Sequence, residues 1–219
     1  LRAGGLPDGA VKFVSGRLGP LLDELGPQDA VSFTGSADTA LALRGTKNLL
    51  RNSVRFAAEQ DSLNATILGG DVAVGDPEFD LFVKEVVTEI TAKAGQKCTA
   101  VRRILVPAPL RGPIAEALSA RLAEVTLGDP RLQEVGMGAL AGAGQKQDVL
   151  GTCALFADEA RCIIGGVAPS LTGEGLDGGA WVAPTIFDCA DPDAATHLHE
   201  KEAFGPVACL MPYRDADHA

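Results

Sequence analysis

The sequence predicts an α/β fold built around a mostly parallel sheet, and three observations lead to this prediction. Residues 29–45 combine a strand-like run, a Gly-Ser turn and a helical run. Residues 77–95 form a long amphipathic pattern, which is followed by a second strand-like run at 100–107. Another helical run, 113–125, comes soon after that strand. Strands that alternate with helices along a chain are typical of parallel sheets.

Shorter elements are expected in the first sixty residues. Gly4 and Gly5 are expected to end a helix tail at residues 1–3, and Ser36 or Asp38 is available as the N-cap of a later helix. The elements expected in this region are a strand at 10–16, a short helix at 19–26, a strand at 29–36 and a helix at 36–45.

The helix predicted at 77–95 has the clearest boundaries. Asp76 can cap its first turn, Pro77 fits the first turn, and Gly95 provides a natural stop. Apolar side chains recur on one face at 3.6-residue spacing, which is typical of a helix that packs on a core. These side chains are Phe79, Phe82, Val83, Val86, Val87, Ile90 and Ala94.

The second half of the chain continues the alternation. A helix is expected at 142–160 and a surface loop at 168–180. The strand-like runs expected here are a buried strand at 162–166 and further strands at 181–187 and 207–213.

Composition excludes several classes of protein. The chain has 219 residues and a formal charge of −10 without a basic stripe, so nucleic-acid binding is not expected. Neither a signal-peptide pattern nor an apolar run of membrane-spanning length occurs. The five cysteines are odd in number and lack C-x-x-C spacing, which disfavours a zinc site or a disulfide framework. We therefore expect a globular protein of the reducing cytoplasm.

Cys98 is the first candidate for chemistry, because it lies on a Gly-Gln-Lys turn between a predicted helix and a predicted strand. Most unpaired cysteines are small core residues. A reactive thiol attacks as the thiolate, so it needs exposure and a setting that tolerates charge. The turn and the neighbouring Lys97 offer both, and the Cys98 backbone N–H could stabilise an oxyanion on its own adduct. The other four cysteines are expected to be core residues.

Two further motifs each allow two interpretations. The "FTGS" segment at 33–36 presents a helix N-terminus that suits a phosphate, although an ordinary β-to-α turn explains it as well. Glu59 lies between two apolar runs, where it is either a partly buried general base or a surface acid, with Asp61 as a competitor.

The segment "EAFGPV" at 202–207 is the last motif of interest. Its Phe204 either anchors a Gly-Pro turn or offers a flat ring to a cofactor. In the second case, Glu202 would bind ribose hydroxyls.

The order of these motifs resembles the aldehyde dehydrogenase superfamily. "FTGS", a glutamate, "GQKCTA" with "RRILV", "GDP", "APT" and "EAFGPV" follow one another along essentially the whole chain. Three longer segments, "AEQDSLN", "PEFDLFVKEVVTEITAKAGQKCTAVRR" and "EAFGPVACLMPY", are similar to one branch of that superfamily. The branch includes the aldehyde dehydrogenase part of the bifunctional ring-opening enzyme of phenylacetate degradation, which is fused to an oxepin-CoA hydrolase. A related branch oxidises the dehydroadipyl-CoA semialdehyde of aerobic benzoate breakdown.

The resemblance implies a role for each candidate residue. Cys98 matches the catalytic nucleophile, and Glu59 matches the glutamate that activates water for deacylation. Gly35 and Ser36 match the turn that contacts the cofactor pyrophosphate. In the last motif, Glu202 and Phe204 match the residues that hold the nicotinamide ribose and ring.

The implied reaction is the oxidation of an aldehyde to a carboxylic acid with NADP or NAD. It proceeds through a thiohemiacetal and a thioester on Cys98, followed by hydrolysis with Glu59 as the base. The implied substrate is a CoA-linked semialdehyde from aromatic-compound degradation, and the implied assembly is a homo-oligomer. No metal is expected to take part.

The resemblance also implies domain limits. Residues 1–62 match the second half of a Rossmann-type cofactor domain, and residues 63–219 match most of an α/β catalytic domain. The side-chain oxyanion donor and the residues that bind the adenosine ribose would precede Leu1, so we expect a piece of a longer enzyme that is nearly inactive alone. Two departures stand out: Gln-Asp-Ser follows Glu59 where Leu-Gly-Gly is common, and Ala40 replaces a frequent glycine.

Two alternatives stay open. One is a CoA-acylating aldehyde dehydrogenase, in which free CoA rather than water takes the acyl group; the presence of Glu59 disfavours it. The other is a truncated, non-catalytic subunit that uses the fold for assembly only.

Overall fold

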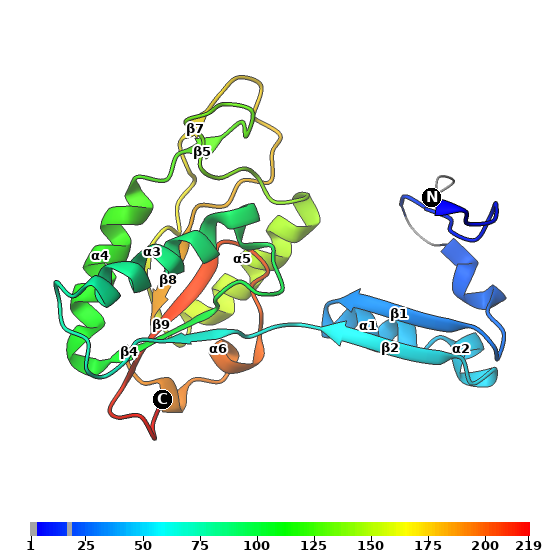
Figure 1. Ribbon diagram of the computed structural model, residues 1–219, viewed down its shortest axis with the longest axis horizontal. Helices are drawn as coiled ribbons and strands as arrows, with labels where there is room; N and C mark the ends of the chain where they lie inside the picture. The colour runs from blue at the N-terminus through cyan, green and yellow to red at the C-terminus, as the bar shows by residue number, and fades with distance from the viewer. Residues whose placement is uncertain (1–3, 17–18) are drawn as a thin grey trace. The chain divides into compact units, whose positions relative to one another are not determined.

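The computed structural model describes residues 4–16 and 19–219, so the helix tail expected at residues 1–3 lies outside the described residues. The chain divides into two compact units, Leu1–Asp61 and Ser62–Ala219. Both units combine helices with mostly parallel strands (Figure 1), which confirms the predicted α/β class. No helix among the described residues is both long enough and apolar enough to cross a membrane.

The first unit contains a small β-α-β arrangement. Its two strands pair in parallel, with Ala30 opposite Arg55 and Gly35 opposite Gln60. Helices connect the end of the first strand to the start of the second, as a parallel pair requires. The elements are the 3₁₀ helix η2 (Gly19–Glu24), β1 (Ala30–Gly35), α1 (Ala37–Arg44), α2 (Lys47–Arg51) and β2 (Arg55–Gln60).

One sequence-based prediction for this unit is wrong, and a second differs from the structure in detail. Residues 10–16 pair with no strand among the described residues, and Phe13 there is 92% exposed. Because a strand is held by hydrogen bonds to a neighbour, apolar and β-branched residues alone do not form one. The short helix expected at 19–26 does form, but it is a 3₁₀ helix that ends at Glu24 and includes non-helical backbone at Pro20.

The second unit is built around a five-stranded sheet with the order β3-β4-β9-β8-β6. All neighbouring strands run parallel except β6 and β8, which are antiparallel. A separate pair, β5 and β7, lies beyond this sheet (top of Figure 1). The strands are β3 (Ala65–Ile67), β4 (Arg103–Pro107), β5 (Leu127–Gly128), β6 (Arg161–Ile164), β7 (Leu171–Thr172), β8 (Thr185–Asp188) and β9 (Val207–Tyr213).

Helices cover both faces of this sheet. On one face α3 and α4 pack over Ile104, Val106 and Leu210, and on the other α5 and α6 pack over Phe187 and Cys209. Strand β9 therefore buries alternate side chains in opposite layers, which explains why every residue of 207–213 except Pro212 is buried. The helices are α3 (Pro77–Thr91), η3 (Ala92–Gly95), η4 (Ala108–Leu110), α4 (Arg111–Ala123), α5 (Ala143–Ala157), η5 (Pro192–Ala194) and α6 (His197–Glu200).

The helix predicted at 77–95 forms as α3, but its ends differ in detail. Pro77 begins the helix, while the Asp76 carboxylate accepts a hydrogen bond from Ala73 N–H rather than from a helix amide. The α-helix stops at Thr91, before the predicted Gly95, because the backbone turns left-handed at Lys93. The predicted apolar face is confirmed, since Phe79, Val83, Val86 and Ile90 are buried.

The strand at 162–166 is shorter and less buried than predicted. Strand β6 lies at the edge of the sheet, so only one side of it has a neighbouring strand. Cys162 in this strand is exposed, which contradicts its predicted place in the core.

Candidate active site

Three segments far apart in the sequence meet because each precedes one of three adjacent strands. Residues 62–64 lead into β3, residues 95–102 into β4, and residues 201–206 into β9. These strands are parallel neighbours in the order β3-β4-β9, so their amino ends lie along one edge. Cys98 and the "EAFGPV" motif are therefore brought together by the topology of the sheet.

The turn that presents Cys98 begins with strained backbone. Lys93, Ala94 and Gly95 have φ values of 53°, 52° and 69°. Left-handed backbone costs a non-glycine residue roughly 1–2 kcal/mol, and such strain is concentrated at functional sites. At Gly95 a side chain is also excluded by space, since a Cβ would lie 2.1 Å from the carbonyl oxygen of Gly205. The backbone of this turn thus rests directly on the "EAFGPV" segment.

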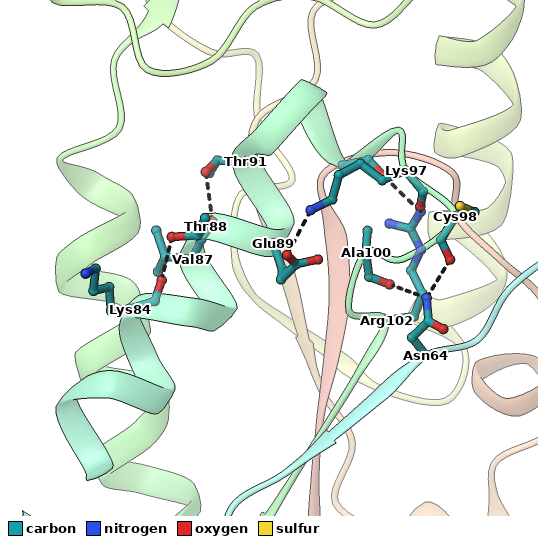
Figure 2. A network of polar contacts seen from close by, with 11 residues as sticks. Asn64, Lys84, Val87, Thr88, Glu89, Thr91, Lys97, Cys98, Ala100 and Arg102 are labelled. Atoms are coloured by element: carbon teal, nitrogen blue, oxygen red, sulfur yellow. Dashed lines mark hydrogen bonds and ion pairs between the residues drawn. The ribbon is translucent and has the colours of Figure 1, made fainter. Parts of the chain in front are cut away.

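Cys98 lies on this turn with an exposed side chain. Its carbonyl oxygen accepts a hydrogen bond of 2.7 Å from the Asn64 amide, which also donates to Ala100 O at 3.0 Å (Figure 2). The thiol is therefore reachable from solvent, as predicted, and the backbone N–H of Cys98 has no partner among the described residues.

The cation beside Cys98 is paired elsewhere. The Lys97 ammonium forms an ion pair of 2.8 Å with Glu89 of α3. Figure 2 shows this lysine reaching back toward the helix, away from the Cys98 sulfur. The predicted electrostatic support of a Cys98 thiolate by Lys97 is therefore reduced by the Glu89 carboxylate.

Arg102 is buried beneath the turn, with only 5% of its surface exposed. Its guanidinium donates to Gly95 O at 2.9 Å and, across to the other segment, to Gly205 O at 2.8 Å. It also forms an ion pair of 3.0 Å with Glu202. Burial lowers the pKa of this guanidinium and the Glu202 carboxylate opposes that shift, so the arginine stays charged at any physiological pH.

Glu202 and Phe204 differ sharply in exposure. The Glu202 side chain is 6% exposed. One carboxylate oxygen forms the ion pair with Arg102, and the other accepts a hydrogen bond of 2.9 Å from Ser62 N–H. Phe204 is 41% exposed, and its ring centroid lies 5.6 Å from the Arg102 guanidinium carbon. The ring is thus offered to solvent, while the carboxylate is held by the protein with lone pairs to spare.

The other four cysteines are less suited to act as nucleophiles. Cys189 and Cys209 are buried in the core. Loss of solvation on burial raises the pKa of Cys153 to about 11 and also raises the pKa of the exposed Cys162. Among the described residues, no group of three or more His, Cys, Asp or Glu side chains could hold a metal ion.

The remaining predicted residues lie together in the first unit, at the carboxyl ends of β1 and β2. Gly35 ends β1, and Ser36 caps α1 by accepting a hydrogen bond of 3.2 Å from Thr39 N–H. Ala37 N–H donates to the Asp61 carboxylate at 3.2 Å. The helix N-terminus predicted to bind phosphate therefore already carries an anionic acceptor from the chain itself.

Glu59 lies on the penultimate position of β2, opposite Thr34, and is exposed. The structure thus places the predicted base on a strand rather than in a loop. The six predicted site residues form two groups, with Gly35, Ser36 and Glu59 in one unit. Cys98, Glu202 and Phe204 form the second group, in the other unit.

Sequence reasoning missed Asn64 and Arg102, the two side chains that hold the Cys98 turn. Arg102 lies inside the run predicted as a strand, and Asn64 lies in the polar segment after Glu59, for which no element is predicted. The available signal was chemical: an arginine at the start of a buried strand requires a partner, because an unpaired charge is rarely buried.

Comparison with known proteins agrees with this architecture. The sequence matches the aldehyde dehydrogenase family over residues 1–219. The chain therefore belongs to the aldehyde dehydrogenase family.

Among curated relatives, the chain is 44% identical over 221 residues to 3,4-dehydroadipyl-CoA semialdehyde dehydrogenase from Aromatoleum evansii. It is 30% identical over 227 residues to 1-pyrroline-5-carboxylate dehydrogenase 2 from Halalkalibacterium halodurans. Both alignments include 100% of this chain, which spans 43% and 41% of the two relatives.

Solved structures of similar fold include two bacterial aldehyde dehydrogenases. Betaine aldehyde dehydrogenase from Staphylococcus aureus in complex with NAD+ aligns with a TM-score of 0.74 at 26% identity, covering 87% of this chain and 36% of the other. The aldehyde dehydrogenase KauB from Pseudomonas aeruginosa aligns with a TM-score of 0.75 at 26% identity, covering 91% and 38%.

Proposed function

We propose that the protein carrying this chain oxidises an aldehyde to the carboxylic acid, with Cys98 as the nucleophile. The observation that carries the proposal is the exposed Cys98 on a strained turn held by buried polar contacts. In this proposal residues 1–62 belong to a cofactor domain and residues 63–219 to a catalytic domain. Membership of the aldehyde dehydrogenase family supports the same assignment.

The residues present fit a nicotinamide dinucleotide. The exposed Phe204 ring suits a nicotinamide face, and Gly35 and Ser36 suit a pyrophosphate at the start of α1, where it would replace the Asp61 carboxylate on Ala37 N–H. Glu202 would accept hydrogen bonds from the ribose. When bound, the dinucleotide supplies the hydride acceptor of the reaction. We propose NADP or NAD in this role; the relative from S. aureus was solved with NAD+.

The chain's own residues would carry the covalent steps. The Cys98 thiolate adds to the aldehyde carbon, and the Cys98 N–H donates to the oxyanion that forms. Loss of hydride from that adduct leaves a thioester on Cys98. Glu59 then takes a proton from water, whose oxygen attacks the thioester carbon and releases the acid and the free thiolate.

The proposed substrate is a CoA-linked semialdehyde from aromatic-compound degradation. The 44% identical relative is named for 3,4-dehydroadipyl-CoA semialdehyde, and the segments around Glu59 and Cys98 resemble the phenylacetate branch. Within this class, the phenylacetate-derived semialdehyde is the one we favour.

A pre-steady-state experiment tests the proposal. In the wild type, a CoA-linked semialdehyde and NADP+ or NAD+ should give steady formation of the reduced dinucleotide. In Glu59→Gln, we expect a burst equal to the concentration of active sites, followed by turnover lower by about 100-fold or more. Cys98→Ser should abolish both phases, and an unchanged burst in that variant would contradict the proposal.

The same experiment separates the CoA-acylating alternative. Free CoA should not accelerate the wild type if water is the acyl acceptor. If free CoA instead accelerates turnover and acyl-CoA accumulates in place of the acid, the protein is a CoA-acylating aldehyde dehydrogenase. Absence of any burst in the wild type, with intact folding, would favour the non-catalytic alternative.

A further inference from the structure

Arg102 makes an unusual set of contacts, because one buried side chain joins two separate segments. On the turn that carries Cys98, its guanidinium donates to Gly95 O at 2.9 Å and to Lys97 O at 3.4 Å. On the "EAFGPV" segment, it donates to Gly205 O at 2.8 Å and to the Glu202 carboxylate at 3.1 Å. All three guanidinium nitrogens thus take part.

The geometry requires an arginine at this position. A guanidinium has five N–H donors in a fixed plane, so it can bond several acceptors in different directions, whereas lysine presents one point charge. Close approach of the two backbones is ensured by Gly95, where a Cβ would clash with Gly205 O. Movement of either segment would break bonds that hold the other.

We propose that Arg102 is a positioning residue that couples the Cys98 turn to the 202–205 segment, so that a nucleotide bound at that segment changes the reactivity of the Cys98 thiol. The inference rests on the proposed function, because it assigns nucleotide binding to Glu202 and Phe204. Arg102 is buried and bonded to backbone carbonyls on both sides, so its effect on the thiol is through position.

Neighbouring Arg103 offers a matched control. It is also an arginine beside the turn, and its guanidinium donates to Leu63 O and contacts His199. It bonds neither the Gly95–Lys97 backbone nor the Gly205 carbonyl. Replacing it removes a partly buried cation without cutting the link between the two segments.

The experiment measures the alkylation rate of Cys98 by iodoacetamide, resolved by peptide mass spectrometry, with and without saturating NADP+ or NAD+. The proteins are the wild type, Arg102→Met, Arg102→Lys and Arg103→Met. In the wild type and in Arg103→Met, we expect nucleotide to change the rate by about fivefold or more. In Arg102→Met, the ratio of the alkylation rates with and without nucleotide should fall to near one. In Arg102→Lys this ratio should be intermediate, because lysine restores the charge but not the planar set of N–H donors.

Each outcome decides the question. Equal ratios in the wild type and in folded Arg102→Met would overturn the inference while leaving the proposed function intact. If Arg102→Met does not fold by circular dichroism, Arg102→Lys decides: a ratio equal to wild type overturns the coupling. A wild-type Cys98 that reacts no faster than a free cysteine and ignores nucleotide would contradict the proposed function, and the inference with it.

Discussion

The Cys98 turn and the Gly35-Ser36 turn are held in different ways. The turn at Cys98 is fixed by side chains that are distant in sequence, chiefly Asn64 and Arg102, and lies against a layered core. The turn at Ser36 is held by Thr39, three residues away, and few side chains of its unit are buried. We therefore expect changes at the Cys98 turn to alter stability and thiol reactivity together, and changes at the Gly35-Ser36 turn to act mainly on binding of the proposed dinucleotide.

The largest expected effect comes from Gly95→Ala. Its Cβ would meet Gly205 O at 2.1 Å on a backbone with φ of +69°. We expect the free energy of unfolding to fall by about 3 kcal/mol or more, because the strain of left-handed backbone adds to that of overpacking. Chemical denaturation measures this change.

Gly112→Ala is the matched control for that substitution. A Cβ at Gly112, in the first turn of α4, meets no atom within 4 Å. We expect no loss of stability there, and a gain of up to about 1 kcal/mol. Similar losses in the two variants would show that the contact between the turn and residue 205 is unimportant.

Asn64→Ala is expected to have the next largest effect. It removes the amide that donates to Cys98 O and Ala100 O, at a cost of about 1–3 kcal/mol in unfolding free energy. It should also change the alkylation rate of Cys98, since that residue's backbone is no longer fixed.

Asn48 provides a matched control in the other unit. Its amide donates in the same way to two carbonyl oxygens, those of Leu22 and Leu25, at 2.9 and 2.8 Å. Asn48→Ala should lose comparable stability and leave Cys98 alkylation unchanged. An equal change in alkylation in both variants would contradict the contrast between the two turns.

A pH-dependent effect is expected at Glu159, which holds the start of α6. Its carboxylate accepts hydrogen bonds from the N–H groups of Thr196, His197 and Leu198. Desolvation is the largest single influence and raises its pKa, but the backbone donors together lower the pKa below its ordinary 4.5. A lowered pKa in the folded state means that the stabilisation is complete above that ordinary value and is lost as the pH falls toward the folded-state pKa.

Glu159→Gln should therefore be less stable than wild type at pH 7. The difference in unfolding free energy between the two proteins should shrink as the pH falls below about 4.5. Denaturation midpoints measured across pH 3–7 check this, with the neighbouring Asp158→Asn as the control. A stability difference between Glu159→Gln and wild type that stays constant with pH would contradict the role of the ionised carboxylate.

The smallest expected effect is an increase in the affinity for NADP+ or NAD+. Asp61→Asn removes the negative charge that meets Ala37 N–H at the start of α1. Because a helix N-terminus favours an anion by about 0.3–1 kcal/mol, NADP+ or NAD+ should bind about two- to fivefold more tightly. Calorimetric titration measures the affinity, and Asp23→Asn, an exposed acid on η2, should leave it unchanged.

Local pattern predicted a large part of the fold. The apolar face of α3, the strand at 207–213 and the Ser36 cap depend on neighbours in sequence, and all three are confirmed. The strand expected at 10–16 is absent because pairing, which a local pattern does not contain, decides whether a strand forms.

The candidate site shows the same limit. The exposed turn at Cys98 followed from its place between a helix and a strand. Arg102 and Glu202 are 100 residues apart, and only the order β3-β4-β9 brings them together. No periodicity in the sequence reports that order, which is why the residues that hold the turn were not predicted.

The most direct test of the account is a comparison of the two exposed thiols. Peptide-resolved alkylation with iodoacetamide near pH 7 gives separate rates for Cys98 and Cys162 in one sample. We predict that Cys98 reacts faster, because it lies on an exposed turn while desolvation raises the pKa of Cys162. A Cys98 that reacts as slowly as Cys162, or more slowly, would contradict its role as the nucleophile.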